Sequence, residues 1–210
     1  MKKFILVLAA LTFSIAAYSQ GFEIGIKGGL NITAAGAVKD LVPGVGISSK
    51  NTYNGGVYGR LKIKLIGIFV QPELVYNTRG YNFDITANGK TYNIKQQAYY
   101  LDVPVLVGLK MFKFLRVYAG PNFQYLLKNE ITGVDDVVAL AIDFKKTDMK
   151  KANTGVQIGF GLDLSKFRVD VKYDFNPTDM GSPFSYQNQV QSIKTSMVTI
   201  QLGYKLFGVL

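Results

Sequence analysis

Apolar and polar residues alternate with a period of two in eight segments of this chain. In the clearest segment, Val156, Ile158, Phe160, Leu162 and Leu164 are separated by Gln157, Gly159, Gly161 and Asp163. Because successive side chains of a strand point to opposite faces, the alternation predicts strands with one apolar and one polar face. The predicted strands span residues 22–32, 56–65, 68–79, 99–110, 115–126, 154–165, 167–175 and 196–207. Each is near the length of about 9–11 residues that a tilted strand needs to cross a bilayer.

The connections between these strands alternate in length. Short turns are expected at residues 66–67, 111–113 and 165–166, and long loops at 33–55, 80–98, 127–153 and 176–195. Short turns at one end and long loops at the other are typical of outer-membrane barrels. The predicted fold class is therefore all-β: an eight-stranded antiparallel up-and-down transmembrane β-barrel with both termini at the short-turn end.

Alternation alone does not decide which face lines the interior, since a secreted lipocalin-like barrel has an apolar interior and a membrane barrel a polar one. Three features indicate that the polar face lines the lumen. Glycines recur there and make room for large neighbours, charges of both signs lie there in mid-strand, and aromatic residues gather near strand ends. The candidate luminal ion-pair residues are Arg60, Glu73, Asp102, Arg116, Asp163, Arg168, Asp170 and Lys172.

The N-terminal segment has the pattern of a secretion signal. Lys2 and Lys3 precede an apolar stretch, residues 4–13, that is short for a membrane span, and Ala17-Tyr18-Ser19 offers small residues for cleavage. We expect residues 1–19 to be a signal peptide and residues 20–210 to form the barrel domain. The alternative is an uncleaved anchor helix.

Two prolines fall inside predicted strands. Pro104 and Pro121 cannot donate a hydrogen bond to the ladder, and a closed barrel has no edge strand to hold them. We therefore predict a local bulge at each proline, which would help a small barrel to bend. The alternative is that each proline only replaces an N–H that would otherwise bond solvent or a side chain.

Both proline-bearing strands also carry a family resemblance. The segment Tyr100-Leu101-Asp102-Val103-Pro104-Val105-Leu106 resembles a strand of the PorT-like outer-membrane β-barrel family, and Val117-Tyr118-Ala119-Gly120-Pro121-Asn122 is similar to the strand that follows it. Later strands, including residues 160–164, 168–173 and 202–205, are similar to the family as well. The resemblance implies an eight-stranded barrel in a Gram-negative outer membrane, and it implies no reaction.

Composition narrows the possible chemistry. The 210 residues include no cysteine and no histidine, which excludes disulfides and thiolate sites and removes the commonest general base and metal ligand. No catalytic, cofactor-binding or metal-binding residue is predicted. The formal net charge is +10, and the basic residues are scattered along the sequence. Contact with anionic lipid head groups is therefore favoured over nucleic-acid binding.

One pair of carboxylates permits an alternative interpretation as a catalytic site. Glu73 and Asp102 lie on the luminal faces of consecutive predicted strands, and the strands that flank them carry Arg60 and Arg116. Paired carboxylates can perform acid–base chemistry. The favoured interpretation is an ion-pair plug that fills the lumen, because buried charges must be paired.

These patterns predict a non-enzymatic integral outer-membrane barrel with a side-chain-filled lumen. Its role would be structural, or it would bind a partner through its long extracellular loops, the loop at residues 127–153 in particular. The expected partners are outer-membrane lipid, the outer-membrane assembly machinery and a protein at the loops. The alternatives are a periplasmic lipocalin-like binder of an apolar ligand and a small barrel enzyme that acts on lipid or peptide.

Overall fold

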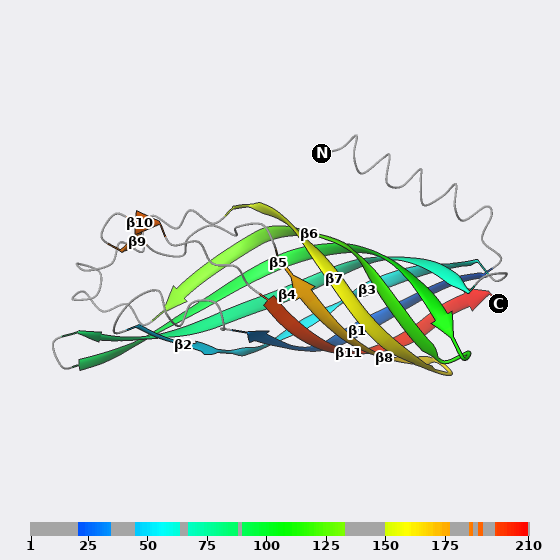
Figure 1. Ribbon diagram of the computed structural model, residues 1–210, viewed down its shortest axis with the longest axis horizontal. Coiled ribbons are helices and arrows are strands. Elements are labelled where there is room, and N and C mark those ends of the chain that lie inside the picture. Colours follow the sequence, from blue (N-terminus) through cyan, green and yellow to red (C-terminus); the bar gives the residue numbers. More distant parts are fainter. Residues whose placement is uncertain are drawn as a thin grey trace.

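The computed structural model describes residues 21–34, 45–63, 67–87, 90–132, 150–176, 185–186, 189–190 and 196–209. Eight long strands dominate this part of the chain: β1 (Gly21–Ala34), β3 (Asn51–Ile63), β4 (Ile68–Ala87), β5 (Lys90–Met111), β6 (Leu115–Thr132), β7 (Ala152–Leu164), β8 (Phe167–Phe175) and β11 (Ser196–Val209). Each pairs antiparallel with the next of these strands, and β1 pairs with β11, so the sheet closes on itself (Figure 1). The predicted fold class is confirmed.

The barrel turns its apolar face outward and its polar face inward. Leu30, Ile158 and Leu202 are 62%, 51% and 58% exposed, whereas Arg116 is 0% and Glu73 is 3% exposed. A lipocalin-like barrel has the opposite arrangement, so the structure excludes that alternative. In the part of the chain that is described, no helix has the length and apolar character to span a membrane.

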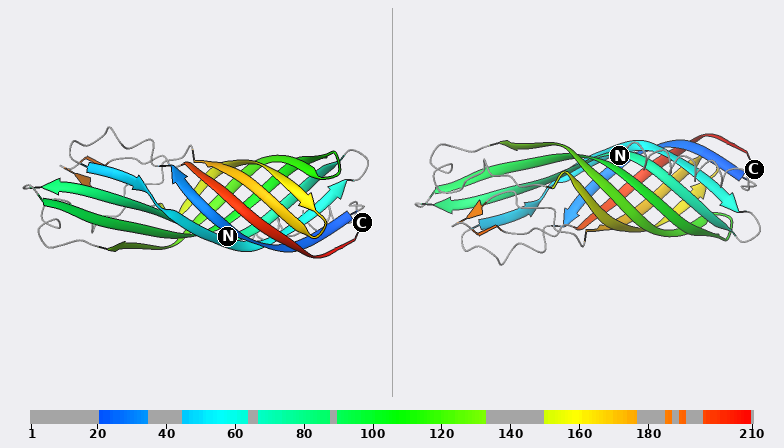
Figure 2. Two further views of the ribbon diagram at one scale, coloured as in Figure 1. Left: turned by 90° about the horizontal axis from the view of Figure 1, so that it is seen from below. Right: turned by 90° about the horizontal axis from the view of Figure 1, so that it is seen from above.

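The prediction of a loop at residues 80–98 is wrong, because strands β4 and β5 continue through this segment. Their pairing runs from Ile68 opposite Leu109 to Ala87 opposite Lys90. A short strand, β2 (Val45–Ser49), lies in the predicted loop at 33–55 and pairs with β4 at residues 81–85. Figures 1 and 2 show β4 and β5 reaching far beyond the barrel, with β2 beside them. We call this four-stranded part, β2-β4-β5-β6 beyond the barrel, the platform.

Two further strands occur among the residues that connect β8 with β11. They are β9 (Ser185–Tyr186) and β10 (Gln189–Val190), which pair with each other. The short connections lie at the other end of the barrel, between β3 and β4, between β5 and β6, and between β7 and β8. In outer-membrane barrels the short turns face the periplasm. The predicted fold would therefore place the platform at the extracellular end.

The bulges predicted at Pro104 and Pro121 are absent. The register of β5 against β6 is the same on both sides of each proline, and so is the register of β4 against β5 around Pro104. The ladder pairing instead skips the residue pairs at these positions and resumes unshifted. The prolines therefore interrupt the ladder without adding a residue, which matches neither the predicted bulge nor the alternative of an N–H outside the ladder.

Register shifts occur at two other places. One lies between Ile24 and Gly25, where β11 contributes the extra residue Leu206. The other lies between Tyr99 and Tyr100, where β6 contributes the extra residue Leu127. Each extra residue bends its strand and increases the local twist. Curvature therefore comes from two leucines near the barrel ends and not from the prolines.

Gly120 lies where the backbone of a neighbouring strand approaches very closely, and we predict that it tolerates no side chain. A Cβ atom built at Gly120 would lie 2.0 Å from the Val105 carbonyl oxygen. Gly120→Ala should therefore lower the free energy of unfolding by about 1–3 kcal/mol, the usual cost of overpacking. The measurement is a urea titration of the protein in lipid vesicles. Its midpoint is the urea concentration at which half of the folded, heat-modifiable gel band is lost.

Gly59 provides the matched control for this substitution. A Cβ atom at Gly59 meets no atom within 4 Å. Gly59→Ala should leave the urea midpoint unchanged or raise it slightly, since alanine reduces the freedom of the unfolded chain. Equal midpoints for the two variants would show that backbone crowding at Gly120 does not limit stability.

Candidate functional site

Charged side chains occupy the lumen in three clusters along the barrel axis. The middle cluster is centred on Glu73 of β4, which is buried and receives two ammonium groups. Lys27 Nζ lies 2.5 Å from Glu73 Oε1, and Lys172 Nζ lies 2.7 Å from Glu73 Oε2. Gln71 Nε2 also donates to Glu73 Oε1 at 2.6 Å. The carboxylate is thus held by strands β1, β4 and β8, which face one another across the lumen.

The cluster at the short-turn end joins two carboxylates to several cations. Asp163 Oδ1 lies 2.7 Å from Arg116 Nε and 3.1 Å from Arg168 Nε. Glu23 Oε1 lies 3.0 Å from Arg168 Nη2 and 3.5 Å from Arg60 Nη1. Arg60 also reaches Asp163 at 3.4 Å, so both carboxylates share the same guanidinium groups. Arg116 links this cluster to Asp170, which lies 3.0 Å from its Nη2.

The cluster nearest the platform is built mainly from amides. Asp102 Oδ2 lies 3.1 Å from Arg79 Nη2 and accepts a hydrogen bond from Asn77 Nδ2 at 2.7 Å. Asp174 accepts hydrogen bonds from Gln157 and from Asn122. These contacts lie along the barrel wall. The cation that pairs with Asp102 is different from the two cations that pair with Glu73.

All eight sequence-predicted residues lie buried in the lumen or at its short-turn end, and each of them forms an ion pair. Glu73 and Asp102 are bound to different cations, and no contact joins them among the described residues. Arg60 and Arg116 pair with Glu23, Asp163 and Asp170, and not with Glu73 or Asp102. The arrangement is therefore an ion-pair network and gives no support to a carboxylate pair for acid–base chemistry.

Sequence reasoning left several luminal residues out of the candidate set. Lys27 and Glu23 lie on the polar face of β1, and Arg79 continues the alternation Gln71, Glu73, Asn77 along β4. The period-two pattern already places Lys27 and Glu23 on the polar face, and it extends to Arg79 as well. It could not find Phe69 and Leu106, which are apolar but lie on the luminal face.

Apolar side chains complete the filling of the lumen next to the charges. Phe69, Leu106 and Tyr118 form a buried cluster, and the Phe69 and Tyr118 rings meet edge to face with centroids 6.3 Å apart. The Arg60 guanidinium lies 5.2 Å from the Phe69 ring centroid, within the range of a cation–π contact. Packed side chains therefore fill the cross-section of the lumen at this level.

Exposed residues at the base of the platform form a polar rim outside the barrel wall. The Tyr99 hydroxyl donates to Glu130 Oε2 at 3.0 Å, and Lys128 pairs with Glu130 Oε1. Hydrogen bonds from Lys128 and Tyr99 hold the pKa of Glu130 below its ordinary value. The Tyr99 ring lies 6.1 Å from the Tyr76 ring, as expected for an aromatic belt at a bilayer interface.

Lysines that are scattered along the sequence gather at the short-turn end, which corrects the expectation that the basic residues form no patch. The lysines there are Lys62, Lys110, Lys113, Lys166 and Lys205. The Lys205 backbone N–H donates to the Lys166 carbonyl, which joins the end of β11 to the β7–β8 turn. Turns far apart in the sequence therefore form one basic rim.

Among the described residues, no group of three or more histidine, cysteine, aspartate or glutamate side chains could hold a metal ion. The buried polar face, the apolar outer face and the short turns define a membrane barrel. The sequence matches the family model described as "Outer membrane protein beta-barrel domain" over residues 16–180. The chain belongs to this family. It is an integral protein of the outer membrane.

The chain is also similar to solved structures of proteins from three sources. OprG from Pseudomonas aeruginosa is 13% identical, with 90% of this chain and 97% of OprG covered and a TM-score of 0.49. Ail from Yersinia pestis is 12% identical, with 89% and 99% covered and a TM-score of 0.44. Neisserial surface protein A is 10% identical, with 88% and 97% covered and a TM-score of 0.43. No curated protein matches the sequence.

Removal of the central carboxylate should destabilise this outer-membrane barrel strongly. Glu73→Gln leaves the ammonium groups of Lys27 and Lys172 buried beside a neutral amide. Breaking a buried ion pair by deleting one partner costs about 3–5 kcal/mol, and we expect a loss of stability in this range. Urea titration of the folded protein in lipid vesicles measures it.

Glu130→Gln is the control, because Glu130 forms its ion pair with the exposed Lys128. Exposed pairs contribute little to stability, so the urea midpoint of this variant should match that of the wild type. A Glu73→Gln midpoint equal to that of Glu130→Gln would contradict a stabilising network in the lumen.

Proposed function

We propose that this chain is a non-enzymatic, non-conducting member of the outer-membrane barrel family that presents its extracellular platform to a protein partner. Within the family we assign it to the PorT-like group, on the motifs at residues 100–106 and 117–122. Residues 1–19 are proposed as the cleaved signal peptide. Assembly machinery of the outer membrane would then insert the barrel.

The filled lumen supports the non-conducting role. Arg60, Arg116, Tyr100, Phe69 and Lys172 are among the largest fully buried side chains, and all of them lie inside the barrel. An eight-stranded barrel is just wide enough for side chains to fill it. Moving these residues aside would separate buried charges from their partners, which is costly.

The proposed binding role rests on the open strand edges of the platform. Beyond the barrel, β2 lies at the end of the sheet order and has only β4 as a neighbour in the described sheet. Among the described residues, the upper part of β6 is a second edge, since its pairing with β7 stops at Tyr125 while its pairing with β5 reaches Thr132. Open strand edges are templates for a partner that adds a strand. The loop segment at residues 133–149, expected from sequence to contact a partner, lies outside the described residues.

A planar-bilayer recording tests the non-conducting role. We expect purified wild-type protein to give no steady conductance steps, because no open path remains between packed luminal side chains. A general porin recorded under the same conditions is the positive control. Steady steps that vanish in the double variant Arg60→Gln, Glu73→Gln would assign a conducting path to this lumen and overturn the proposal.

Site-specific photocrosslinking in intact cells tests the binding role. Lys95 is exposed on the platform strand β5, and Lys166 is exposed in the β7–β8 turn at the opposite end. A photoreactive residue at position 95 should capture a protein that the same residue at position 166 does not capture. Replacing residues 81–96 by a short turn should remove the binding without unfolding the barrel. Identical products from both positions would contradict a partner at the platform.

A further inference from the structure

A basic pocket opens at the short-turn end of the barrel, between the β3–β4 and β5–β6 connections. It has a volume of about 310 Å³, and its polar lining consists of Arg60, Lys62, Lys110, Lys113 and Arg116. The Lys110 backbone N–H donates to the Gly67 carbonyl at 2.8 Å, which ties the two connections together. No aspartate or glutamate belongs to the described lining.

Cations outnumber carboxylates around this pocket. Among the described residues, five basic side chains share the carboxylates of Glu23 and Asp163. These side chains are Arg60, Lys62, Lys110, Arg116 and Arg168. Arg116 also reaches Asp170, and Lys113 adds a further positive charge to the lining. Buried charges need compensation, so the pocket has the electrostatic character of an anion site.

One buried guanidinium has spare capacity for such an anion. The Arg116 side chain is 0% exposed, and its Nε and Nη2 lie beside Asp163 and Asp170. None of its three nitrogens, Nε, Nη1 and Nη2, makes a hydrogen bond to another described residue, and Nη1 has no ion-pair contact either among those residues. Because a guanidinium presents several donors in a fixed plane, Nη1 can bind an oxyanion while the other two nitrogens keep their carboxylates.

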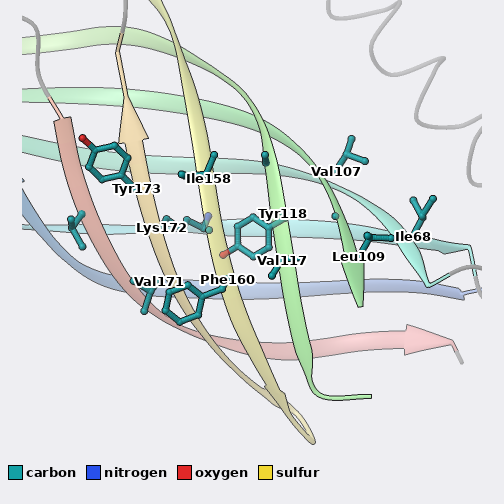
Figure 3. Close-up of a pocket in the computed structure, with 14 residues that line it drawn as sticks. Ile68, Val107, Leu109, Val117, Tyr118, Ile158, Phe160, Val171, Lys172 and Tyr173 are labelled. Atoms are coloured by element: carbon teal, nitrogen blue, oxygen red, sulfur yellow. The ribbon is translucent and has the colours of Figure 1, made fainter. Parts of the chain in front are cut away.

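An apolar groove on the outer wall shares a lining residue with this pocket. Ile68 lines both, and it pairs with Leu109 in the ladder. From there the groove crosses β5, β6, β7 and β8, past Val107 and Ile158 to Tyr173, with a volume of about 830 Å³ (Figure 3). The small residue Ala119 lies on its path. Since this wall faces hydrocarbon, the natural occupant of the groove is an acyl chain.

The pocket lies at the depth where lipid head groups are found. Phe112 and Phe114, in the turn that carries Lys113, are 76% and 51% exposed. Aromatic side chains at the end of a membrane barrel mark the interface between hydrocarbon and water. An anion at this depth, joined to an acyl chain on the outer wall, is a phospholipid of the periplasmic leaflet.

We propose that the basic pocket binds the phosphate of one phospholipid of the periplasmic leaflet, with an acyl chain of the same lipid in the adjoining groove. Arg60 and Arg116 contact the phosphate from the lumen side, and Lys110 and Lys113 contact it from the rim. The site depends on the membrane location of the barrel and not on the platform. Failure of the binding experiments above therefore leaves it untouched.

Native mass spectrometry of the full chain released from detergent tests this site, with three probes. The probes are phosphatidylglycerol, diacylglycerol with the same acyl chains, and inorganic phosphate. We expect one phosphatidylglycerol to be retained by the wild type, and neither of the other two probes at the same concentration. Diacylglycerol lacks the phosphate and inorganic phosphate lacks the acyl chain, so each removes one half of the interaction.

Two matched pairs of variants locate the binding. Lys110→Gln with Lys113→Gln should weaken retention about 25-fold, from about fivefold for each lysine near an anionic head group. Lys166→Gln with Lys205→Gln removes two lysines from the same rim outside the pocket and should change nothing. Ala119→Leu fills the groove and should also weaken retention, whereas Val57→Leu on the outer wall away from the groove should not. Heat-modifiable gel mobility confirms that each variant is folded.

Three other outcomes would contradict the proposal. Equal retention of phosphatidylglycerol by all folded variants shows lipid bound around the whole barrel and overturns the site. Retention of diacylglycerol as strong as that of phosphatidylglycerol removes the role of the basic pocket. Retention of inorganic phosphate that depends on Lys110 and Lys113 but not on Ala119 assigns the pocket to a free anion and overturns the lipid assignment.

Discussion

The structure depends on the neutralisation of buried charge inside a narrow closed sheet. A lumen of eight strands leaves no layer of bulk water around its charged groups, so each charge must find a partner across the barrel. Glu73 meets this condition with ammonium groups from β1 and β8. The contacts tie opposite walls together, and they determine which residues the polar face of each strand can carry.

The same crowding explains residues that look unfavourable in isolation. Glycine weakens a strand in most sheets, but at Gly120 the backbone of the neighbouring strand occupies the space of a side chain. Pro104 and Pro121 interrupt the ladder without shifting it. A barrel tolerates these local losses because the remaining pairing and the luminal network hold the register on both sides.

The barrel strands could be predicted from sequence because lipid outside and charge inside impose a strict period of two. The prediction for β8 agrees with the structure at both ends. The platform was missed although the alternation continues into it, with Tyr81, Phe83 and Ile85 separated by Asn82, Asp84 and Thr86. The expected strands were limited to the length that a bilayer requires, and β4 and β5 continue beyond that length. Asn88-Gly89 is a typical hairpin signal between alternating residues, and it was the available clue to a tight connection between β4 and β5.

The ion-pair partners could not be predicted in the same way. Alternation places Lys27, Glu73 and Lys172 on the polar face, but they come from β1, β4 and β8, which are not neighbours in the sheet. Their contact depends on the tilt of the strands and on how far each side chain reaches across the lumen. The basic rim likewise results from turns that only the closed barrel brings together.

The pairing of β1 with β11 joins residues from opposite ends of the chain, such as Phe22 and Val209. Contacts between neighbouring strands close short loops, whereas this contact must bring together nearly the whole chain and is the slowest to form. Until it forms, one side of β1 and one side of β11 keep unpaired backbone groups, which hydrocarbon does not tolerate. The order of assembly follows from this topology: hairpins come first and the seam comes last. The charges of the lumen must therefore already face inward when the two ends of the chain meet.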